Sequence, residues 1–241
     1  MSEEFKTFID YYLADLRKRY YLALSSFYLY DRFRELAAPN VVGQEKAVEN
    51  VKILNRFGSF FLVSKEALRI CFLLELAKIF DDHRLSLHIE KLIWFYSANI
   101  ERFSKNDFIE FNENREFMKG LAETYKGVDE ADLTNIKIKL EGNKGIINRL
   151  VGYRNQQLCH SDIERSEIDL NREEIITLLK FIEEFLNLFS SRLNSSTTLY
   201  DRVEEECKNN LDYVIEYLIR FEPYRLAEIR KRYGLPDDLI V

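Results

Sequence analysis

The chain has 241 residues, of which 46% are apolar and 14% aromatic, and a composition this rich in core-forming side chains excludes an intrinsically disordered chain. The 8 glycines and 3 prolines offer few positions for tight turns, which favours helices over β-hairpins. The formal net charge of −6 argues against a protein that coats nucleic acid through its overall electrostatic field, but it is compatible with a local basic site.

The cysteines and the N-terminal sequence predict a reduced, cytoplasmic setting. Cys71, Cys159 and Cys207 are odd in number and widely spaced, so neither a disulfide framework nor a zinc knuckle is indicated. The first residues lack the basic and apolar regions of a signal peptide. The longest run without a charged residue, residues 20–30, is shorter than the ~18 residues that a membrane-spanning helix needs, so we expect no membrane contact.

A long helix is predicted from residue 4 to about residue 36. Apolar side chains recur there every three or four positions, the spacing of a helix that is buried on one side. Pro39 and Asn40 are expected to end it. Tyrosines crowd this segment, and we favour core or subunit interface over base stacking for them, because aromatic rings bury a large area. They are Tyr11, Tyr12, Tyr20, Tyr21, Tyr28 and Tyr30.

A second long helix is predicted from residue 44 to residue 80, and Ser86 is expected to cap a third helix that reaches about residue 103. Asp81, Asp82 and His83 lie between these helices and suggest a metal site. Against it, His83 and His88 would lie about 140° apart on a helix, and no further ligand stands at a recognisable spacing. A metal-dependent hydrolase at this place is therefore the weakest of three hypotheses for the function, and the other two concern the stretch from Val151 to Asp162.

The rest of the chain also shows helical patterns, with no strand-like alternation longer than four residues. A polar connection (104–129) precedes a helix over 131–140, a turn at 142–145 and a further helix from residue 146. Asn171 and Glu174 have the spacing of a capping box, which predicts the start of a helix with an apolar face. Another helix is predicted over 199–221, and Pro223 is expected to begin a short last one. We predict an all-α protein.

The stretch from Val151 to Asp162 carries the candidate chemistry, because it holds Arg154, Asn155 and His160. Residues 137–160 contain five basic residues and one acidic residue, although the chain as a whole is negative. A phosphate-bearing ligand would be drawn to such a cluster, but charge runs of this size are more often solvated faces.

Arginine and histidine together can cleave a phosphodiester without a metal. The 2'-hydroxyl of RNA needs a base to remove its proton, and the imidazole of His160 titrates near neutral pH and can serve as base or acid. The guanidinium of Arg154 can hold two phosphate oxygens and stabilise the negative charge that develops. The amide of Asn155 can orient His160 or the phosphate.

The spacing argues against a site made by one unbroken helix, on which Arg154 and His160 would lie about 120° and ~9 Å apart. Either the helix ends near Cys159, or two chains each contribute a pair of residues to a composite site, and we favour both together. From the spacing alone, a structural histidine with an arginine paired to a carboxylate is the better interpretation.

The sequence Arg154-Asn155 followed by four residues and His160, near the end of a late helix, resembles the RNxxxxH signature of the HEPN superfamily. The segments 60–68, 77–81 and 85–87, in which a long helix ends in Phe80-Asp81 before a Ser-Leu start, are similar to the abortive-infection AbiU-type branch of that superfamily. The likeness covers roughly residues 10–190. It implies a helical bundle with long antiparallel helices over residues 1–193, with residues 194–241 as a helical extension packed on the same domain.

The resemblance implies a metal-independent ribonuclease that needs no cofactor and acts in phage defence or as a toxin held by an antitoxin. Such proteins are usually dimers in which the motifs of two subunits meet in a cleft, so we expect RNA and a second copy of the chain as partners. Arg154 and His160 are then catalytic, with Asn155 as their polar neighbour. Many members of the superfamily are inactive, so a non-catalytic module that binds a protein or a nucleotide is the alternative hypothesis.

Overall fold

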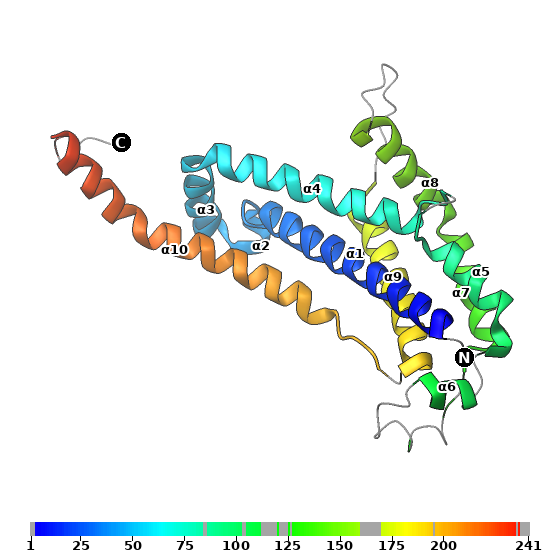
Figure 1. The fold of residues 1–241 in the computed structure, drawn as a ribbon. Coiled ribbons are helices and arrows are strands. Elements are labelled where there is room, and N and C mark those ends of the chain that lie inside the picture. The colour runs from blue at the N-terminus through cyan, green and yellow to red at the C-terminus, as the bar shows by residue number, and fades with distance from the viewer. Residues whose placement is uncertain are drawn as a thin grey trace. The chain divides into compact units, whose positions relative to one another are not determined.

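The computed structural model describes residues 3–83, 86–102, 105–111, 120, 125, 127–159, 170–194, 196–234 and 236, so the predicted site residue His160 lies outside the described residues. All regular elements in this part of the chain are helices, which confirms the all-α prediction (Figure 1). The chain divides into two compact units. Unit 1 comprises Met1–Leu24 and Ile70–Tyr200, and unit 2 comprises Ser25–Arg69 and Asp201–Val241.

The helices follow the predicted order, with two short helices added, over Pro39–Val42 and Lys105–Phe111, and three further differences that are described below. They are α1 (Glu3–Glu35), α2 (Pro39–Val42), α3 (Gln44–Arg56), α4 (Gly58–Phe80), α5 (Ile89–Ala98), α6 (Lys105–Phe111), α7 (Glu130–Gly142), α8 (Lys144–Tyr153), α9 (Arg172–Asn194) and α10 (Asp201–Tyr233). A 3₁₀ turn covers Ile100–Arg102, and a π-helical stretch covers Arg154–Cys159. None of the helices in the described ranges is both long enough and apolar enough to cross a membrane.

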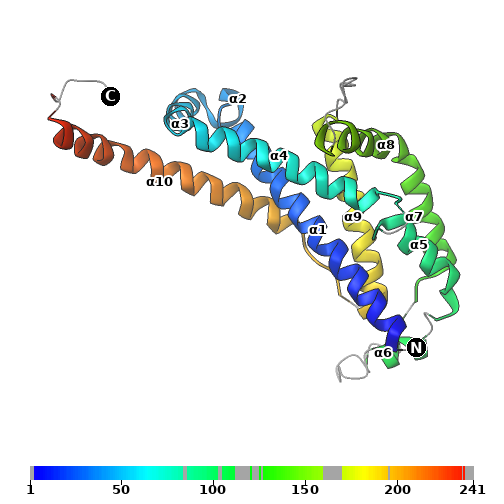
Figure 2. The same ribbon diagram turned by 45° about the horizontal axis from the view of Figure 1, so that its top comes forward.

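Aromatic side chains of α1, α5 and α9 form the centre of unit 1. Tyr12 and Tyr20 of α1 are fully buried, and the ring of Tyr96 lies 4.1 Å from the ring of Phe189. The apolar face predicted for the helix after Asn171 is buried as expected. Its members are at most 3% exposed, and they are Ile175, Leu178, Leu179, Ile182, Phe185, Leu186 and Phe189. The tyrosines of α1 fall into two groups, because Tyr12 and Tyr20 are buried whereas Tyr11 and Tyr21 are 65% and 54% exposed. In both views α5 runs beside α7 (Figures 1 and 2).

Side-chain caps fix the helix starts of unit 1. The backbone N–H of Glu174 donates to Oδ1 of Asn171 over 2.9 Å, and the N–H of Asn171 donates to Glu174 Oε2 over 3.1 Å, so the predicted capping box is confirmed. A second capping box joins Asp129 and Asp132 at the start of α7. The start of α5 differs from the prediction, because His88 caps this helix in place of Ser86.

A tyrosine of α1 holds His88 in its capping position. The hydroxyl of Tyr12 accepts a hydrogen bond from the backbone N–H of His88 over 3.1 Å and donates one to its carbonyl oxygen over 3.2 Å. Nδ1 of His88 accepts from the backbone N–H of Lys91 over 3.3 Å. Desolvation by burial raises the pKa of Tyr12 to about 12, so this hydroxyl stays a donor at neutral pH.

Unit 2 has its own small core between α1, α4 and α10. Its buried members are Phe33, Leu36, Phe61, Leu211 and Ile215. The single helix predicted over residues 44–80 is wrong, since α3 ends at Arg56 and α4 begins at Gly58. Phe57 leaves helical geometry between them, with φ −109° and ψ 36°, and its ring packs against that of Phe61. The apolar period continues across the break, which is why the pattern concealed it.

The helix α10 runs through Pro223, which corrects the prediction of a separate last helix starting at that proline. A proline inside a helix removes one backbone hydrogen bond and normally kinks or breaks the helix. Here the adjacent Glu222 is only 8% exposed and bonds Arg225 through both carboxylate oxygens, over 2.7 Å and 2.8 Å. Arg56 of α3 reaches the same carboxylate over 3.0 Å. The ion pair with Arg56 fastens α10 to α3 beside the proline, and the pair with Arg225 spans the helical turn that contains the proline.

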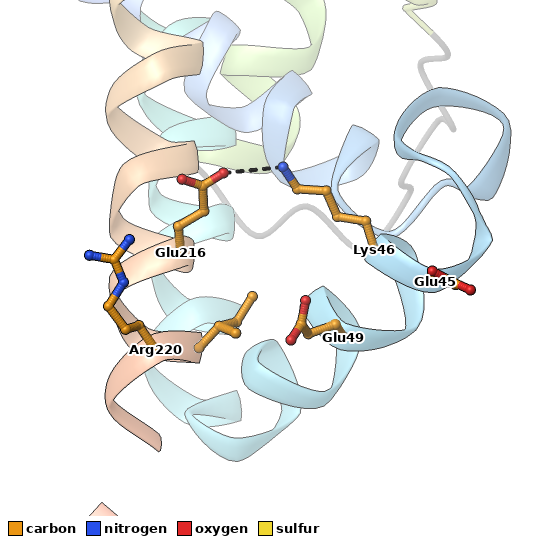
Figure 3. Close-up of a pocket in the computed structure, with 6 residues that line it drawn as sticks. Glu45, Lys46, Glu49, Glu216 and Arg220 are labelled. Atoms are coloured by element: carbon orange, nitrogen blue, oxygen red, sulfur yellow. Dashed lines mark hydrogen bonds and ion pairs between the residues drawn. The ribbon is translucent and has the colours of Figure 1, made fainter. Parts of the chain in front are cut away.

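On the neighbouring side, α3 and α10 enclose an open pocket of about 700 Å³ (Figure 3). Glu216 of α10 and Lys46 of α3 form an ion pair of 3.2 Å across it, while Glu45 and Glu49 line the α3 side. Its lining mixes both signs of charge, so it selects no particular class of ligand.

Candidate functional site

The buried end of α8 positions Arg154. Leu150 and Tyr153 are 0% and 8% exposed, and the chain leaves the core at the next residue. The backbone N–H of Arg154 bonds to the carbonyls of both Leu150 and Val151. The α-helix ends at Tyr153, and the chain continues as a π-helix from Arg154 to Cys159.

The π-helix changes the geometric argument made from the sequence. The separation of about 120° and ~9 Å between Arg154 and His160 assumed α-helical turns throughout. A π-helix closes its hydrogen bonds from residue i to residue i+5, so each turn is wider and holds more residues. The estimate therefore does not apply between Arg154 and Cys159. Such stretches are rare and occur frequently at functional sites.

Arg154 reaches a carboxylate that lies 73 positions earlier in the chain. Its Nη1 donates to Oδ2 of Asp81 over 2.5 Å. Its Nε and Nη2 donate to Oδ1 of Asn155 over 3.0 Å and 2.8 Å, so the guanidinium holds two acceptors at once. The side chains of Arg154 and Asp81 are 15% and 18% exposed. The structure thus brings Arg154 and Asn155 together and adds Asp81 to them.

The end of α4 fixes Asp81 in place. The ring of Phe80 stacks on that of Phe181 of α9, with 6.2 Å between their centres, and Asp81 follows directly. Oδ1 of Asp81 accepts from the backbone N–H of His83 over 3.3 Å. The hydrogen bond from Arg154 lowers the pKa of Asp81, against a smaller opposing effect of partial burial. Asp81 is therefore an ionised acceptor that orients the guanidinium.

The residues of the metal hypothesis have other contacts. Asp81 bonds Arg154, and His88 caps α5. Within the described parts of the chain, no three histidine, cysteine, aspartate or glutamate side chains come together in a group that could hold a metal ion. Desolvation lowers the pKa of His88, so its ring is neutral at pH 7 and accepts the capping bond.

The basic cluster predicted over residues 137–160 is largely compensated in space, which the count along the sequence could not show. Four of its five basic residues form ion pairs with carboxylates of other segments, and Lys137 donates to the hydroxyl of Ser97 over 2.9 Å. The four pairs are Lys139–Glu184, Lys144–Glu90, Arg149–Glu174 and Arg154–Asp81. A general positive field that draws phosphates to this region is therefore not supported.

Sequence reasoning missed Asp81 as the partner of Arg154, although a signal was present. A carboxylate directly after the last turn of a helix meets the negative end of the helix dipole, which is unfavourable without a cation nearby. The aspartate that ends the segment Phe80-Asp81 therefore required a positive partner. Which of the 35 lysines and arginines supplied it could not be read from the sequence.

Comparison with known protein families matches residues 5–214 to the HEPN family described as AbiU2. The chain belongs to the AbiU2 family of HEPN proteins. The family is all-helical and related to abortive infection, so the resemblance seen in the sequence is confirmed at this level. Comparisons with curated proteins and with solved structures give no match. The matched range contains Asp81, Arg154 and Asn155, and it ends within α10 of this AbiU2-family protein.

Proposed function

We propose that this AbiU2-family protein is a metal-independent endoribonuclease that cuts RNA through the 2'-hydroxyl and acts as a toxin or phage-defence effector. The observation that carries the proposal is the guanidinium of Arg154, held by Asp81 and Asn155 at the start of a π-helical turn. His160 follows this turn directly in the sequence. Arginine, asparagine and histidine so close together supply the chemistry that cleavage without metal requires.

Arg154 has the role of binding the phosphate and stabilising the negative charge of the phosphorane. Its bonds to described residues use three of the five guanidinium N–H groups, so a phosphate would bind the other two or displace Asn155. Asp81 is a positioning residue, because it fixes the direction of the guanidinium. A preoriented donor needs no reorganisation when the charge develops.

His160 has the role of base for the 2'-hydroxyl and acid for the leaving 5'-oxygen, or of one of the two. The attack closes the 2'-oxygen on phosphorus and breaks the bond to the 5'-oxygen, so the products are a 2',3'-cyclic phosphate and a 5'-hydroxyl. The proposed site is composite, with two copies of the chain each contributing one motif. A cytoplasmic setting and control by an antitoxin or a defence partner belong to the same proposal.

Cleavage in a chelator tests the reaction. Wild type is expected to cut RNA, to leave DNA of the same sequence intact and to produce cyclic phosphate ends, while Arg154→Ala and His160→Ala should be slower by at least about 100-fold. Arg149→Ala is the matched control, since it removes an arginine of the preceding helix α8, one that pairs with Glu174. Equal cutting by wild type, Arg154→Ala and His160→Ala contradicts the proposal.

The ion pair between Arg154 and Asp81 also supports a second function, a non-catalytic module that binds a protein or a nucleotide. In that case the guanidinium serves the fold. The expected result is that wild type cuts no RNA and that Arg154→Ala melts at a lower temperature. Full folding of Arg154→Ala, with loss of cleavage alone, contradicts this second function.

A further inference from the structure

The turn after α4 places a second histidine beside the candidate site. The backbone N–H of His83 donates to Oδ1 of Asp81 over 3.3 Å, while Arg154 donates to Oδ2 of the same carboxylate over 2.5 Å. The backbone of His83 and the guanidinium of Arg154 are therefore held on the two oxygens of one carboxylate. In the sequence His83 suggested only a metal site, and within the described parts of the chain no group of ligands forms one.

The backbone of His83 is held on both sides, and its side chain points to solvent. Its carbonyl oxygen accepts from the backbone N–H of Ser86 over 2.8 Å, which closes the turn. The side chain of His83 is exposed. His88 differs, since it is only 6% exposed and its ring accepts the capping bond of α5. Of these two histidines, only His83 offers its ring to a ligand bound at Arg154.

The charges of His83 and Asp81 interact. The hydrogen bond from Arg154 is the main cause of the lowered pKa of Asp81, and the backbone bond and the ring charge of His83 lower this pKa further. The ionised carboxylate of Asp81 therefore attracts a protonated imidazole. A general acid must carry its proton before the reaction begins, so this neighbour suits an acid better than a base.

Cleavage through the 2'-hydroxyl requires two proton transfers. A base takes the proton of the 2'-hydroxyl, and an acid gives a proton to the 5'-oxygen that leaves. The attacking and leaving oxygens lie roughly in line, on opposite sides of the phosphorus. One imidazole cannot contact both oxygens at the same moment, so a reaction that is assisted at both ends needs a second group besides His160.

We infer that His83 is the general acid of this reaction and gives its proton to the leaving 5'-oxygen while Arg154 holds the phosphate. The inference rests on the proposed function and adds one catalytic residue to it. The 2'-oxygen bonds to phosphorus as the bond to the 5'-oxygen breaks. The proton of the 2'-hydroxyl passes to His160, and the proton of His83 ends on the 5'-hydroxyl. His83 is left neutral and takes up a new proton from water.

An RNA with sulfur in place of the leaving 5'-oxygen tests the assignment, because a thiolate leaves without being protonated. Wild type in chelator is first used to map a cut site, and the same RNA is then made with sulfur at that bond. His83→Ala keeps the backbone bond to Asp81 and should cut the oxygen substrate at least about 100-fold more slowly than wild type. On the sulfur substrate its rate should come within about threefold of wild type.

Two kinds of control accompany this variant. Arg154→Ala and His160→Ala should stay slow on the sulfur substrate, since they act on the phosphate and on the 2'-hydroxyl. Asp82→Asn changes the exposed neighbour and should cut both substrates as wild type does. His83→Gln keeps a polar side chain that cannot transfer a proton, so it should behave as His83→Ala does and serves in its place if the alanine variant melts early.

Two outcomes overturn the inference while wild type still cuts RNA and the proposed ribonuclease stands. In the first, His83→Ala and His83→Gln cut the oxygen substrate as fast as wild type. In the second, they are slowed to the same degree on both substrates, which places the effect of His83 elsewhere than at the leaving oxygen. A wild type that cuts no RNA removes the proposed function and this inference with it.

Discussion

At the scale of single residues, the contact between Arg154 and Asp81 is the main addition to the candidate site. It links the residue after α4 to the residue after α8, both of which leave a buried helix end. A guanidinium held on one side by a carboxylate presents its other N–H groups in a fixed direction. The pair therefore contributes to folding and to the direction of Arg154 at the same time.

Asp81→Asn is expected to lower the free energy of unfolding at pH 7 by about 1–3 kcal/mol, because Arg154 then keeps its charge in a mostly buried place without a full counter-charge. Urea unfolding measures the change. If the proposed ribonuclease is correct, cleavage also falls, since the guanidinium loses its direction. Asp82→Asn is the control, as Asp82 is exposed and adjacent.

The same pair has a defined pH dependence. Arg154 holds the pKa of folded Asp81 below its unfolded value, so the stabilising effect is complete above the ordinary aspartate range and is lost as the pH falls through the folded pKa. Wild type and Asp81→Asn should therefore converge in stability in acid. A difference in unfolding free energy between wild type and Asp81→Asn that stays constant from pH 7 to about pH 2 contradicts the ion-pair explanation.

At the scale of helices, the apolar periodicity predicted most elements. It failed where a single residue determines whether a helix begins, ends or continues. The apolar face of α9 and the capping box of Asn171 and Glu174 follow from local pattern, and both are confirmed. The break at Phe57 and the continuity through Pro223 come with contacts between residues far apart in the chain, which no local pattern encodes: Arg225 lies over the ring of Phe57, and Arg56 pairs with Glu222. The cap of α5 belongs to the same class, because Tyr12 holds His88 in place from another helix.

For the candidate site, the sequence predicted the stretch and the residue types but not the partners. Arg154 and Asn155 lie together because they are neighbours in the chain, which needs no fold. The pairing of Arg154 with Asp81 is a contact across 73 positions, and the charge balance of the cluster depends on four such contacts. Counting charges along a helix cannot include the carboxylates that the fold brings to it. The predicted role of His160 stays a prediction.

The cap of α5 predicts a loss of stability in mild acid. Desolvation lowers the pKa of His88, so the unfolded chain takes up a proton near pH 6.5 that the folded chain resists, and stability falls as the pH falls. The charges near His88 are those of Glu90, Lys91, Asp82 and Asp81.

His88→Asn keeps a good capping residue and removes the titration. Between about pH 7.5 and pH 5.5, wild type should therefore lose more stability than this variant, by at most about 1.4 kcal/mol per pH unit. His83→Asn is the control, since it replaces an exposed histidine outside the cap and leaves the bond from the N–H of Lys91 to Nδ1 of His88 in place. Identical pH curves for wild type and His88→Asn contradict the explanation by the cap.

At the scale of the whole molecule, α10 belongs to the packing of unit 2. Leu211 and Ile215 of α10 complete the core cluster that contains Phe33, Leu36 and Phe61. Arg32 of α1 also bonds Asp212 through two nitrogen atoms, each over 2.8 Å. The division into residues 1–193 and 194–241 stays a prediction, but the contacts of unit 2 show what removal of the second part would expose.

A chain that ends at residue 193 should aggregate or melt at a lower temperature, because Phe33, Leu36 and Phe61 lose their cover. Thermal melting and size-exclusion chromatography measure this. A chain that ends after Tyr233 keeps all of α10 and is the control. A stable monomeric chain of residues 1–193 with the wild-type melting temperature contradicts the importance of α10 for the core.

The π-helical stretch after α8 has a consequence for how the motif tolerates changes in length. A turn closed from i to i+5 holds one residue more than a turn closed from i to i+4. Deletion of one residue between Arg154 and Cys159 can be absorbed by a return to α-helical turns, with the backbone bonding preserved. The number of residues between Arg154 and His160, which the proposed function requires, would then be one fewer. The stretch is therefore permissive for folding, whereas the proposed function fixes its length, so a length change here separates the two requirements.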